Sequence, residues 1–197
     1  MRVIAGSLRS RTLAAPPGLA TRPTSDRLRE TLFNVLAPRI QGAAFLDLYA
    51  GSGAVGIEAL SRGAVRVEFV ERAPVALKVL RGNLDKLGFT AGFRIHSAAV
   101  GATLRRIGAP NRGAERYDVV FLDPPYDADH EYEATLGVLG GTAAGLLADG
   151  AVVIAEHRKK SRLESRYGQL VRTRLLEQGD AALSFYSVEA RAEGDAE

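Results

Sequence analysis

The sequence predicts an α/β fold built on a Rossmann-like, mostly parallel sheet of seven strands. Two observations support this prediction: short apolar segments alternate with helical ones, and a glycine-rich loop follows the first of these segments. Strands joined by crossover helices pair in parallel and are covered on both faces. We expect strands at 44–49, 65–70, 93–97, 117–122 and 151–155, and helices at 54–62, 74–87, 99–107 and 131–147.

The end of the chain supplies the remaining two strands. Segments 169–177 and 182–189 are separated by a short turn, which predicts an antiparallel hairpin at the edge of the sheet. The last residues, 191–197, have the composition of a disordered tail. The main domain is therefore expected over residues 21–190.

The start of the chain predicts a short extension. Residues 2–5 and 11–14 have the pattern of two strands, which predicts a β-hairpin within residues 1–20. A helix should follow from Thr24 or Ser25 to about residue 37, because apolar residues recur there at helical spacing before a proline.

Composition excludes several classes of protein. The chain has 197 residues, of which 46% are hydrophobic and 25% charged, as in an ordinary globular domain. It has no cysteine, no apolar run long enough to cross a membrane and no pattern of a signal peptide. Its three histidines lack metal-ligand spacing. We therefore expect a cytoplasmic, monomeric protein with neither a metal site nor a membrane partner.

The glycine-rich loop predicts a site for a nucleoside-containing cofactor. Gly51, Gly53 and Gly56 form the pattern G-x-G-x-x-G after the first strand, and Glu71 ends the next strand. This pattern also suits NAD, with the acid on a ribose. Asp47 argues against NAD, because its carboxylate beside the loop would repel a pyrophosphate and attract a cation. S-adenosyl-L-methionine has a sulfonium, an ammonium and a ribose, and it has no phosphate.

The stretch FLDPPYD, at 121–127, predicts a site for an amino group on a base. Asp123 and the carbonyl of Pro124 can accept hydrogen bonds from an exocyclic amine and offset the charge that develops on it. Pro124 and Pro125 fix the backbone of these acceptors. Tyr126 can stack on the base.

Positive charge is concentrated at the start of the chain. Residues 1–30 contain six arginines against Asp26 and Glu30, which gives this segment a formal charge of +4. Arginine is suited to phosphate contact because its guanidinium group pairs two oxygens at once. We expect Arg2, Arg9 and Arg11 to contact nucleic acid.

These motifs together resemble the RsmD family of class I S-adenosylmethionine-dependent methyltransferases. The similarity rests on RPTSDRLRETLF, at 22–33, and LDLYAGSGAVGIEALSRGA, at 46–64, followed by D-P-P-Y. It implies methyl transfer to N2 of guanine 966 in bacterial 16S rRNA, within the small ribosomal subunit or an assembly intermediate. It implies that guanine is held by residues 123–126 and that Arg22, Thr24 and Arg27 border the active site. The cofactor residues expected on this basis are Asp47, Tyr49, Ala50, Gly51, Ser52, Gly53, Glu71, Arg72, Ala98 and Ala99.

The sequence departs from related methyltransferases at one position and leaves alternatives open. An acid or asparagine often follows the third strand and meets the adenine amine, whereas this chain has Ala98 and Ala99. The contact would then come from Ser97 or from the backbone. Other D-P-P-Y enzymes methylate DNA adenine or protein glutamine, although a DNA enzyme usually needs a target-reading domain for which this chain has no room. A non-enzymatic nucleotide-binding module would not need Asp123.

Overall fold

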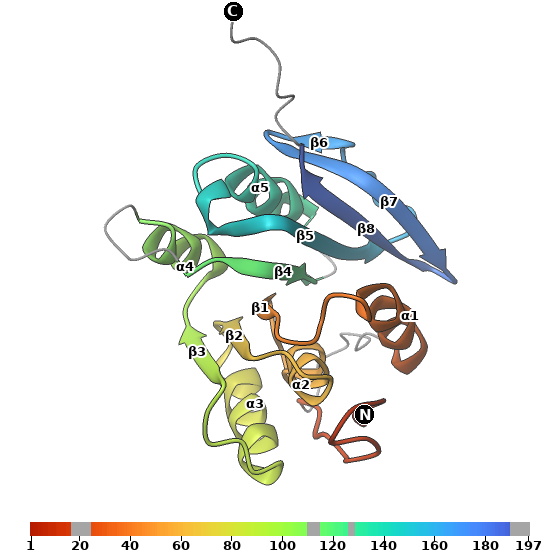
Figure 1. Cartoon of the computed structure of the whole chain (residues 1–197), viewed down its shortest axis with the longest axis vertical. Helices are drawn as coiled ribbons and strands as arrows, with labels where there is room; N and C mark the ends of the chain where they lie inside the picture. Colours follow the sequence, from red (N-terminus) through yellow and green to blue (C-terminus); the bar gives the residue numbers. More distant parts are fainter. Residues whose placement is uncertain (17–24, 110–114, 126–128, 190–197) are drawn as a thin grey trace, which may run out of the picture.

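A computed structural model describes residues 1–16, 25–109, 115–125 and 129–189, which form one mixed sheet flanked by helices (Figure 1). Its strands follow the order β3-β2-β1-β4-β5-β8-β7-β6. The helices are α1 (Asp26–Leu36), α2 (Ala54–Ser61), α3 (Pro74–Lys86), α4 (Val100–Ile107), α5 (Asp129–Leu139) and the 3-10 turn η1 (Ala144–Leu146). The strands are β1 (Ala44–Leu48), β2 (Arg66–Glu71), β3 (Phe93–Ser97), β4 (Tyr117–Leu122), β5 (Leu147–Arg158), β6 (Arg166–Tyr167), β7 (Leu170–Gln178) and β8 (Ala181–Val188).

The pairing of strands confirms the predicted class of fold. Strands β1 to β5 pair in parallel, and β8, β7 and β6 continue the sheet in antiparallel pairs. The sheet contains one strand more than expected, the two-residue β6. Open parallel sheets bind ligands at the carboxyl ends of their strands, so a ligand site is expected at the carboxyl ends of β1, β2 and β4.

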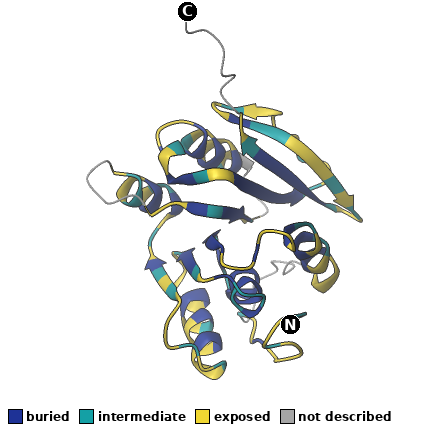
Figure 2. Ribbon diagram, viewed as in Figure 1, coloured by how far each residue is buried: buried dark blue, intermediate teal, exposed yellow. Residues whose placement is uncertain are grey.

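Two hydrophobic cores cover the two faces of the sheet. On one face the N-terminal segment, α1, α2 and α3 pack against the strands, with Phe33, Phe45 and Phe69 at the centre. On the other face α4, α5 and η1 pack around Leu104, Leu136 and other apolar side chains. Figure 2 shows the central strands as buried and the outer sides of the helices as exposed.

The predicted helix at 131–147 was wrong in its second half. Helix α5 ends at Leu139, and β5 already begins at Leu147. Gly140 and Gly141 follow the helix, and the backbone of Gly140 lies so close to the carbonyl of Tyr167 that a Cβ atom would be 1.8 Å from that oxygen. This close approach of β6 takes the chain out of the helix.

The N-terminal hairpin is also less regular than predicted. Its two arms form one isolated bridge, between Arg2 and Thr12, rather than two strands. The amides of Ile4 and Ala5 donate instead to the carboxylate of Glu58 on α2, at 2.7 and 3.0 Å. The segment is therefore fastened to the main domain by a buried acid. The predicted tail lies outside the described residues.

Glu58 is also the centre of a buried ionic network. It accepts from Nε of Arg62 at 2.7 Å and lies 3.9 Å from Nε of the fully buried Arg29. Arg29 in turn donates to the carbonyl of Arg2 and to Asp26. Burial lowers the pKa of Arg29, and the charge of Glu58 opposes this effect. The network joins the N-terminal segment, α1 and α2 into one unit.

A second contact holds the other arm of this segment. Asn83 on α3 accepts from the amide of Ala14 at 2.8 Å and donates to its carbonyl at 3.1 Å. The side-chain amide of Asn83 also donates to the carbonyl of Ser52 in the glycine-rich loop, at 2.9 Å. Asn83 thereby positions Ala15 and Pro16 beside that loop. No helix in the described parts of the chain is long and apolar enough to cross a membrane.

Gly53 is required by packing. It precedes α2 at φ +81°, and a Cβ atom there would lie 2.3 Å from Cδ1 of Leu80 and 3.3 Å from Cδ1 of Ile57. A glycine is therefore needed both for the left-handed backbone and for the contact with α3.

We predict that Gly53→Ala lowers the free energy of unfolding by about 2 kcal/mol or more, from left-handed strain and overpacking. Gly82→Ala is the matched control, because Gly82 is exposed inside α3 and its Cβ would meet nothing within 4 Å. The control should gain about 0.5–1 kcal/mol. Urea unfolding measures both, and equal stabilities would contradict the packing role of Gly53.

Candidate active site

A cavity of about 430 Å³ lies at the carboxyl ends of β1, β2 and β4. This volume is in the range of small-ligand sites. The glycine-rich loop, the end of β2, the segment before α4 and the turn after β4 all contribute to its wall. The predicted residues that line it are Asp47, Tyr49, Ala50, Gly51, Ser52, Glu71, Arg72, Ala98, Ala99, Asp123, Pro124 and Pro125.

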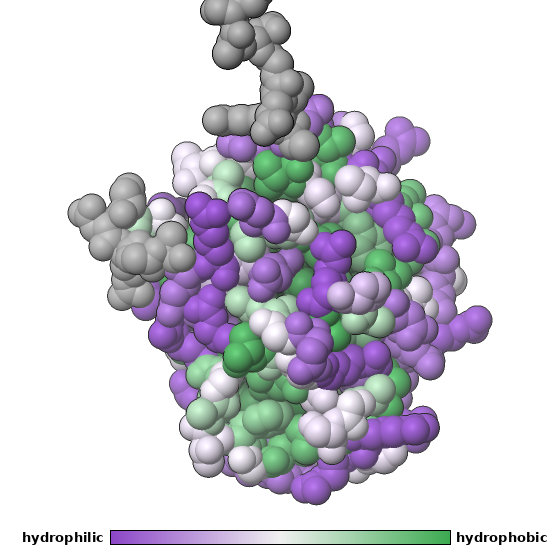
Figure 3. Space-filling model, viewed as in Figure 1, coloured by the Kyte–Doolittle hydropathy of each residue, from purple (hydrophilic) through white to green (hydrophobic). Residues whose placement is uncertain are grey.

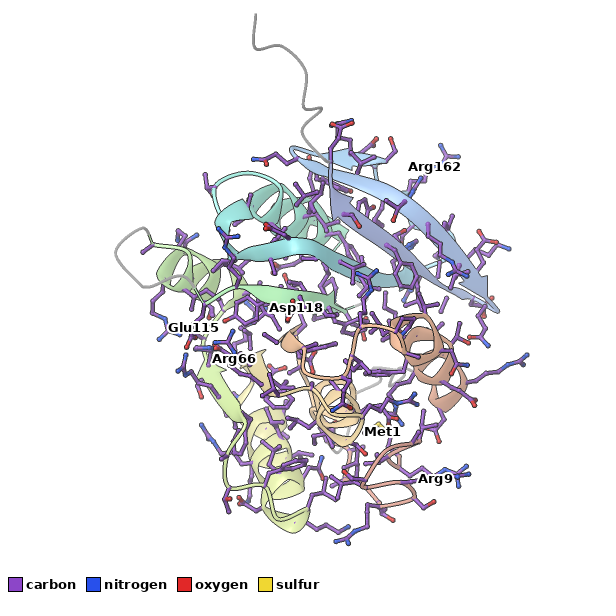
Figure 4. All side chains as sticks on the ribbon, in the orientation of Figure 1. Met1, Arg9, Arg66, Glu115, Asp118 and Arg162 are labelled. Carbon is purple, nitrogen blue, oxygen red and sulfur yellow. The ribbon has the colours of Figure 1, made fainter. Side chains whose placement is uncertain are left out.

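Gly53 is the one predicted cofactor residue absent from this lining, because its Cα faces the core. Met1, Ala15 and Pro16, which the sequence did not indicate, are part of the wall. The N-terminal segment therefore closes one side of this first cavity. Figure 4 labels Met1 at the start of that segment.

The glycine-rich loop is held in a fixed, partly left-handed shape. Tyr49 and Gly51 have φ values of +62° and +56°. The hydroxyl of Tyr49 is 2.9 Å from a carboxylate oxygen of Glu131 and 2.7 Å from the hydroxyl of Thr135, both on α5. A non-glycine residue in this conformation is strained, and such strain is common at functional sites. The loop leads into α2 on one face of the sheet and is held by α5 on the other face.

Asp47 is an acid with a raised pKa in the wall of the first cavity. It is buried, and its carboxylate accepts from the amide of Gly56 at 2.9 Å. Burial raises the pKa of Asp47 from 3.8 to about 7, against the opposing effect of the Gly56 amide, and the charge of Glu71 raises it further. A cationic ligand would stabilise the ionised form.

Glu71 is fixed by three backbone amides at the end of β2. One oxygen accepts from Gly51 at 2.9 Å, and the other accepts from Arg72 and Ala73 at 2.8 and 2.7 Å. A carboxylate has about four acceptor positions, so one position remains to accept from a ribose hydroxyl.

Ala98 and Ala99 contribute apolar wall between β3 and α4. Ser97, which the sequence offered as an adenine contact, is bonded through its hydroxyl to Arg81 at 3.0 Å and does not line the cavity. Hydrogen bonds to an adenine at this wall would therefore come from backbone groups.

The residues of the first cavity fit S-adenosylmethionine better than a dinucleotide. Four acids, Asp47, Glu71, Asp123 and Glu131, line it, together with one basic residue, Arg72. A pyrophosphate would meet the buried carboxylate of Asp47, whereas an ammonium or sulfonium would be stabilised by it. Glu71 and Asp47 would bind the polar groups of the cofactor, and Ala98 and Ala99 would pack on its adenine.

A second cavity, of about 910 Å³, lies on the other side of Asp123. Its wall includes Asp123 and Glu156, Leu28 of α1 with the N-cap residue Ser25, and the turn between β7 and β8. Asp123 is thus shared by the two cavities. Burial raises the pKa of Asp123 well above its usual value, and the charges of Glu156 and Asp47 raise it further. Tyr126 lies outside the described residues.

Three consecutive basic residues form part of the wall of the second cavity. Arg158, Lys159 and Lys160 line its rim at the end of β5, and sequence analysis did not single them out. The signal was the run RKKSR, at 158–162, which is separated by two residues from the predicted strand at 151–155. On the face shown in Figure 3, hydrophilic side chains are widespread and apolar ones gather in smaller areas between them.

The arginines predicted to contact nucleic acid are exposed where they are described. Arg9, Arg11 and Arg27 are exposed, and Figure 4 shows Arg9 pointing outward from the N-terminal segment. Arg2 is also exposed but lies 3.7 Å from Asp26. The structure does not bring these side chains to the rim of either cavity. Arg22 and Thr24 lie outside the described residues.

Comparison with known proteins supports the assignment of the first cavity to S-adenosylmethionine. The chain is 36% identical over all 197 residues to ribosomal RNA small subunit methyltransferase D of Escherichia coli, covering 94% of that protein. It is 35% identical to YlbH of Bacillus subtilis, described as a candidate rRNA methyltransferase, over 94% of this chain and 98% of YlbH. A solved structure of yhhF of E. coli, described as a candidate methyltransferase, matches with a TM-score of 0.82 and 33% identity, over 97% of this chain and 99% of yhhF.

Fold, cavity and similarity together define an S-adenosylmethionine-dependent methyltransferase. The family model described as Conserved hypothetical protein 95 matches residues 1–187. The chain therefore belongs to this family, which is the RsmD family, and the resemblance drawn from the sequence is confirmed.

We predict that Asp47→Asn weakens binding of S-adenosylmethionine by roughly 10- to 100-fold, the effect of losing one charge-assisted contact. The pKa of Asp47 is higher in the folded protein, so wild-type stability falls as pH rises from about 4 to about 7. The variant should escape this loss and be more stable than wild type above pH 7, but not below pH 4. Calorimetry and thermal unfolding across pH measure the two effects.

Asp118→Asn is the matched control for this variant. Asp118 accepts from the amide of Ala44 at 2.8 Å but lies at the opposite end of the strands, outside both cavities. Its variant should bind the cofactor with wild-type affinity. If Asp47→Asn did so too, Asp47 would have no role in binding the cofactor.

Proposed function

We propose that this protein methylates the N2 amine of a guanine in 16S rRNA, at the position corresponding to guanine 966, in the small ribosomal subunit or an assembly intermediate. The relative in E. coli is named as a small-subunit rRNA methyltransferase. The observation that carries the proposal is the position of Asp123 between a cavity suited to the cofactor and a second cavity with a basic rim.

The chemistry follows from the acceptors at the end of β4. The bound cofactor supplies an electrophilic methyl group. An exocyclic amine is a weak nucleophile because its lone pair is delocalised into the ring. Asp123 and the carbonyl of Pro124 would accept hydrogen bonds from the two N–H groups of the amine. These bonds would direct its lone pair towards the first cavity, and the carboxylate of Asp123 would offset the positive charge that develops on the nitrogen. Pro124 and Pro125 hold these acceptors in place before the substrate binds.

The size of the chain favours a folded particle as substrate. Most of the described residues form the sheet and its helices, and among them the N-terminal segment, α1 and the end of β5 are our candidates for contact with RNA. Such a small surface relies on phosphate contacts and on a base that is already displayed. Methylation of DNA adenine or protein glutamine is the alternative.

We predict that Asp123→Ala lowers methyl transfer by roughly 100-fold or more and leaves cofactor affinity close to normal. Asp123→Asn should be milder, because its amide oxygen still accepts one hydrogen bond. Methyl transfer under single-turnover conditions and calorimetry measure the two quantities. A wild-type rate in the alanine variant would mean that D-P-P-Y is only a turn.

The substrate is tested with wild-type protein and labelled S-adenosylmethionine. Small subunits from cells that lack this methylation, the naked rRNA, a short hairpin with the same loop, and duplex DNA are compared in parallel. We expect the label on one guanine, highest in small subunits, with mass spectrometry placing the methyl group on N2. Preferential labelling of DNA or of a protein glutamine would overturn the proposal.

Two basic segments are candidates for contact with RNA phosphates. Replacing Arg9 and Arg11 by alanine, or Lys159 and Lys160 by alanine, should weaken substrate binding and reduce its salt slope by up to about two units in each case. Cofactor affinity should stay unchanged in both. The measurement is the KM for small subunits over a range of salt concentrations. A pair whose removal leaves the salt slope unchanged does not contact the RNA backbone.

A further inference from the structure

Glu156 is a buried acid in the second cavity that no sequence motif assigned. It lies near the carboxyl end of β5, it is 6% exposed, and it lines the cavity together with Asp123. The hydroxyl of Tyr132 donates to its backbone carbonyl at 2.7 Å, which fixes the position of the strand there. A buried acid at the carboxyl end of a parallel strand is a candidate for ligand contact.

The register of the sheet places Glu156 beside Asp123. Strands β4 and β5 are parallel neighbours in which Leu122 pairs with Ala155. The next residue along each strand, Asp123 and Glu156, therefore lies opposite the other. Phe121 and Ile154, two residues earlier on each strand, lie in the same core. Because residues two apart on a strand point to the same face, Asp123 and Glu156 lie on the same face of the sheet as Phe121 and Ile154. Neighbouring strands are about 4.8 Å apart.

Two acceptors at this spacing suit two adjacent donors on a planar base. The Watson–Crick edge of guanine presents N1–H next to the N2 amine, and both point in the same direction. Adenine and cytosine present an unprotonated ring nitrogen at the corresponding position, which a carboxylate would repel. Paired acceptors of this kind distinguish bases strongly.

We infer that Glu156 is a specificity-determining residue, which accepts the N1–H of the target guanine while Asp123 and the carbonyl of Pro124 accept its N2 amine. The inference rests on the proposed function and adds the means by which guanine is selected. Glu156 lies farther from the first cavity than Asp123 and is not part of its lining, so it reads the base without touching the cofactor.

The charges around Glu156 agree with this role. Its charge raises the pKa of Asp123 from one side and the pKa of the buried Arg29 from another, so it lies within electrostatic reach of both. Asp47 also raises the pKa of Asp123, from β1. The neighbouring His157 is directed to the hydroxyl of Ser184 on β8, at 2.9 Å. Donors on a bound guanine would relieve the repulsion between the two acids.

The test uses small subunits reconstituted with guanine or 2-aminopurine at the target position. 2-Aminopurine keeps the exocyclic amine that receives the methyl group, but its N1 carries no proton. Wild type should prefer guanine in kcat/KM by roughly 10- to 100-fold. In Glu156→Gln the amide can donate to an unprotonated N1, so this preference should fall by at least about 10-fold. A structural role would lower both rates alike and leave their ratio unchanged, which would overturn the inference.

Controls separate folding from base recognition. Glu156→Gln should keep wild-type affinity for S-adenosylmethionine and a cooperative thermal unfolding transition, and Glu133→Gln, which replaces an exposed acid on α5, should keep the wild-type preference. If Glu156→Gln does not fold, Glu156→Asp and wild type on the two bases decide the matter. Equal use of both bases by wild type would overturn the role of Glu156, whereas absence of guanine methylation would overturn the proposed function itself.

Discussion

The site depends on three acids that the fold gathers at the carboxyl ends of three adjacent strands. Asp47 lies on β1, Glu156 lies on β5 and Asp123 directly follows β4, and these strands are neighbours in the sheet. Removing carboxylates from water is unfavourable unless cations or hydrogen-bond donors replace the water. The raised pKa of Asp47 and of Asp123 is the physical sign of that cost. A cationic cofactor on one side and an amine on the other would both offset it.

The N-terminal segment contributes to the same site by a different route. Glu58 and Arg29 are buried together and hold the first residues of the chain against α1 and α2, and Asn83 holds the arm that reaches the glycine-rich loop. The segment thereby closes one side of the first cavity with Met1 and Pro16 while it keeps Arg9 exposed. Cofactor wall and candidate RNA contact lie on one short stretch of chain.

Much of the site could be predicted because parallel strands place their carboxyl ends at one edge. Asp47 and Glu71 lie near the ends of apolar strands, Asp123 directly follows one, and all three line the first cavity. Gly53 matched the loop pattern, but its need for glycine comes from Leu80, which is distant in sequence. Glu156 ends an apolar strand as Asp123 does. Its importance follows from the pairing of β4 with β5, which the sequence did not fix residue by residue.

The most direct test of this account is the release of protons when S-adenosylmethionine binds. At pH 7 about half of the Asp47 carboxyls should be protonated in the free protein, because the pKa is about 7. Calorimetry in buffers of different ionisation enthalpy counts the protons released. The account predicts that wild type releases about half a proton more per cofactor than Asp47→Asn at pH 7, and that the difference disappears at pH 9. Equal proton release by the two proteins at pH 7 would contradict it.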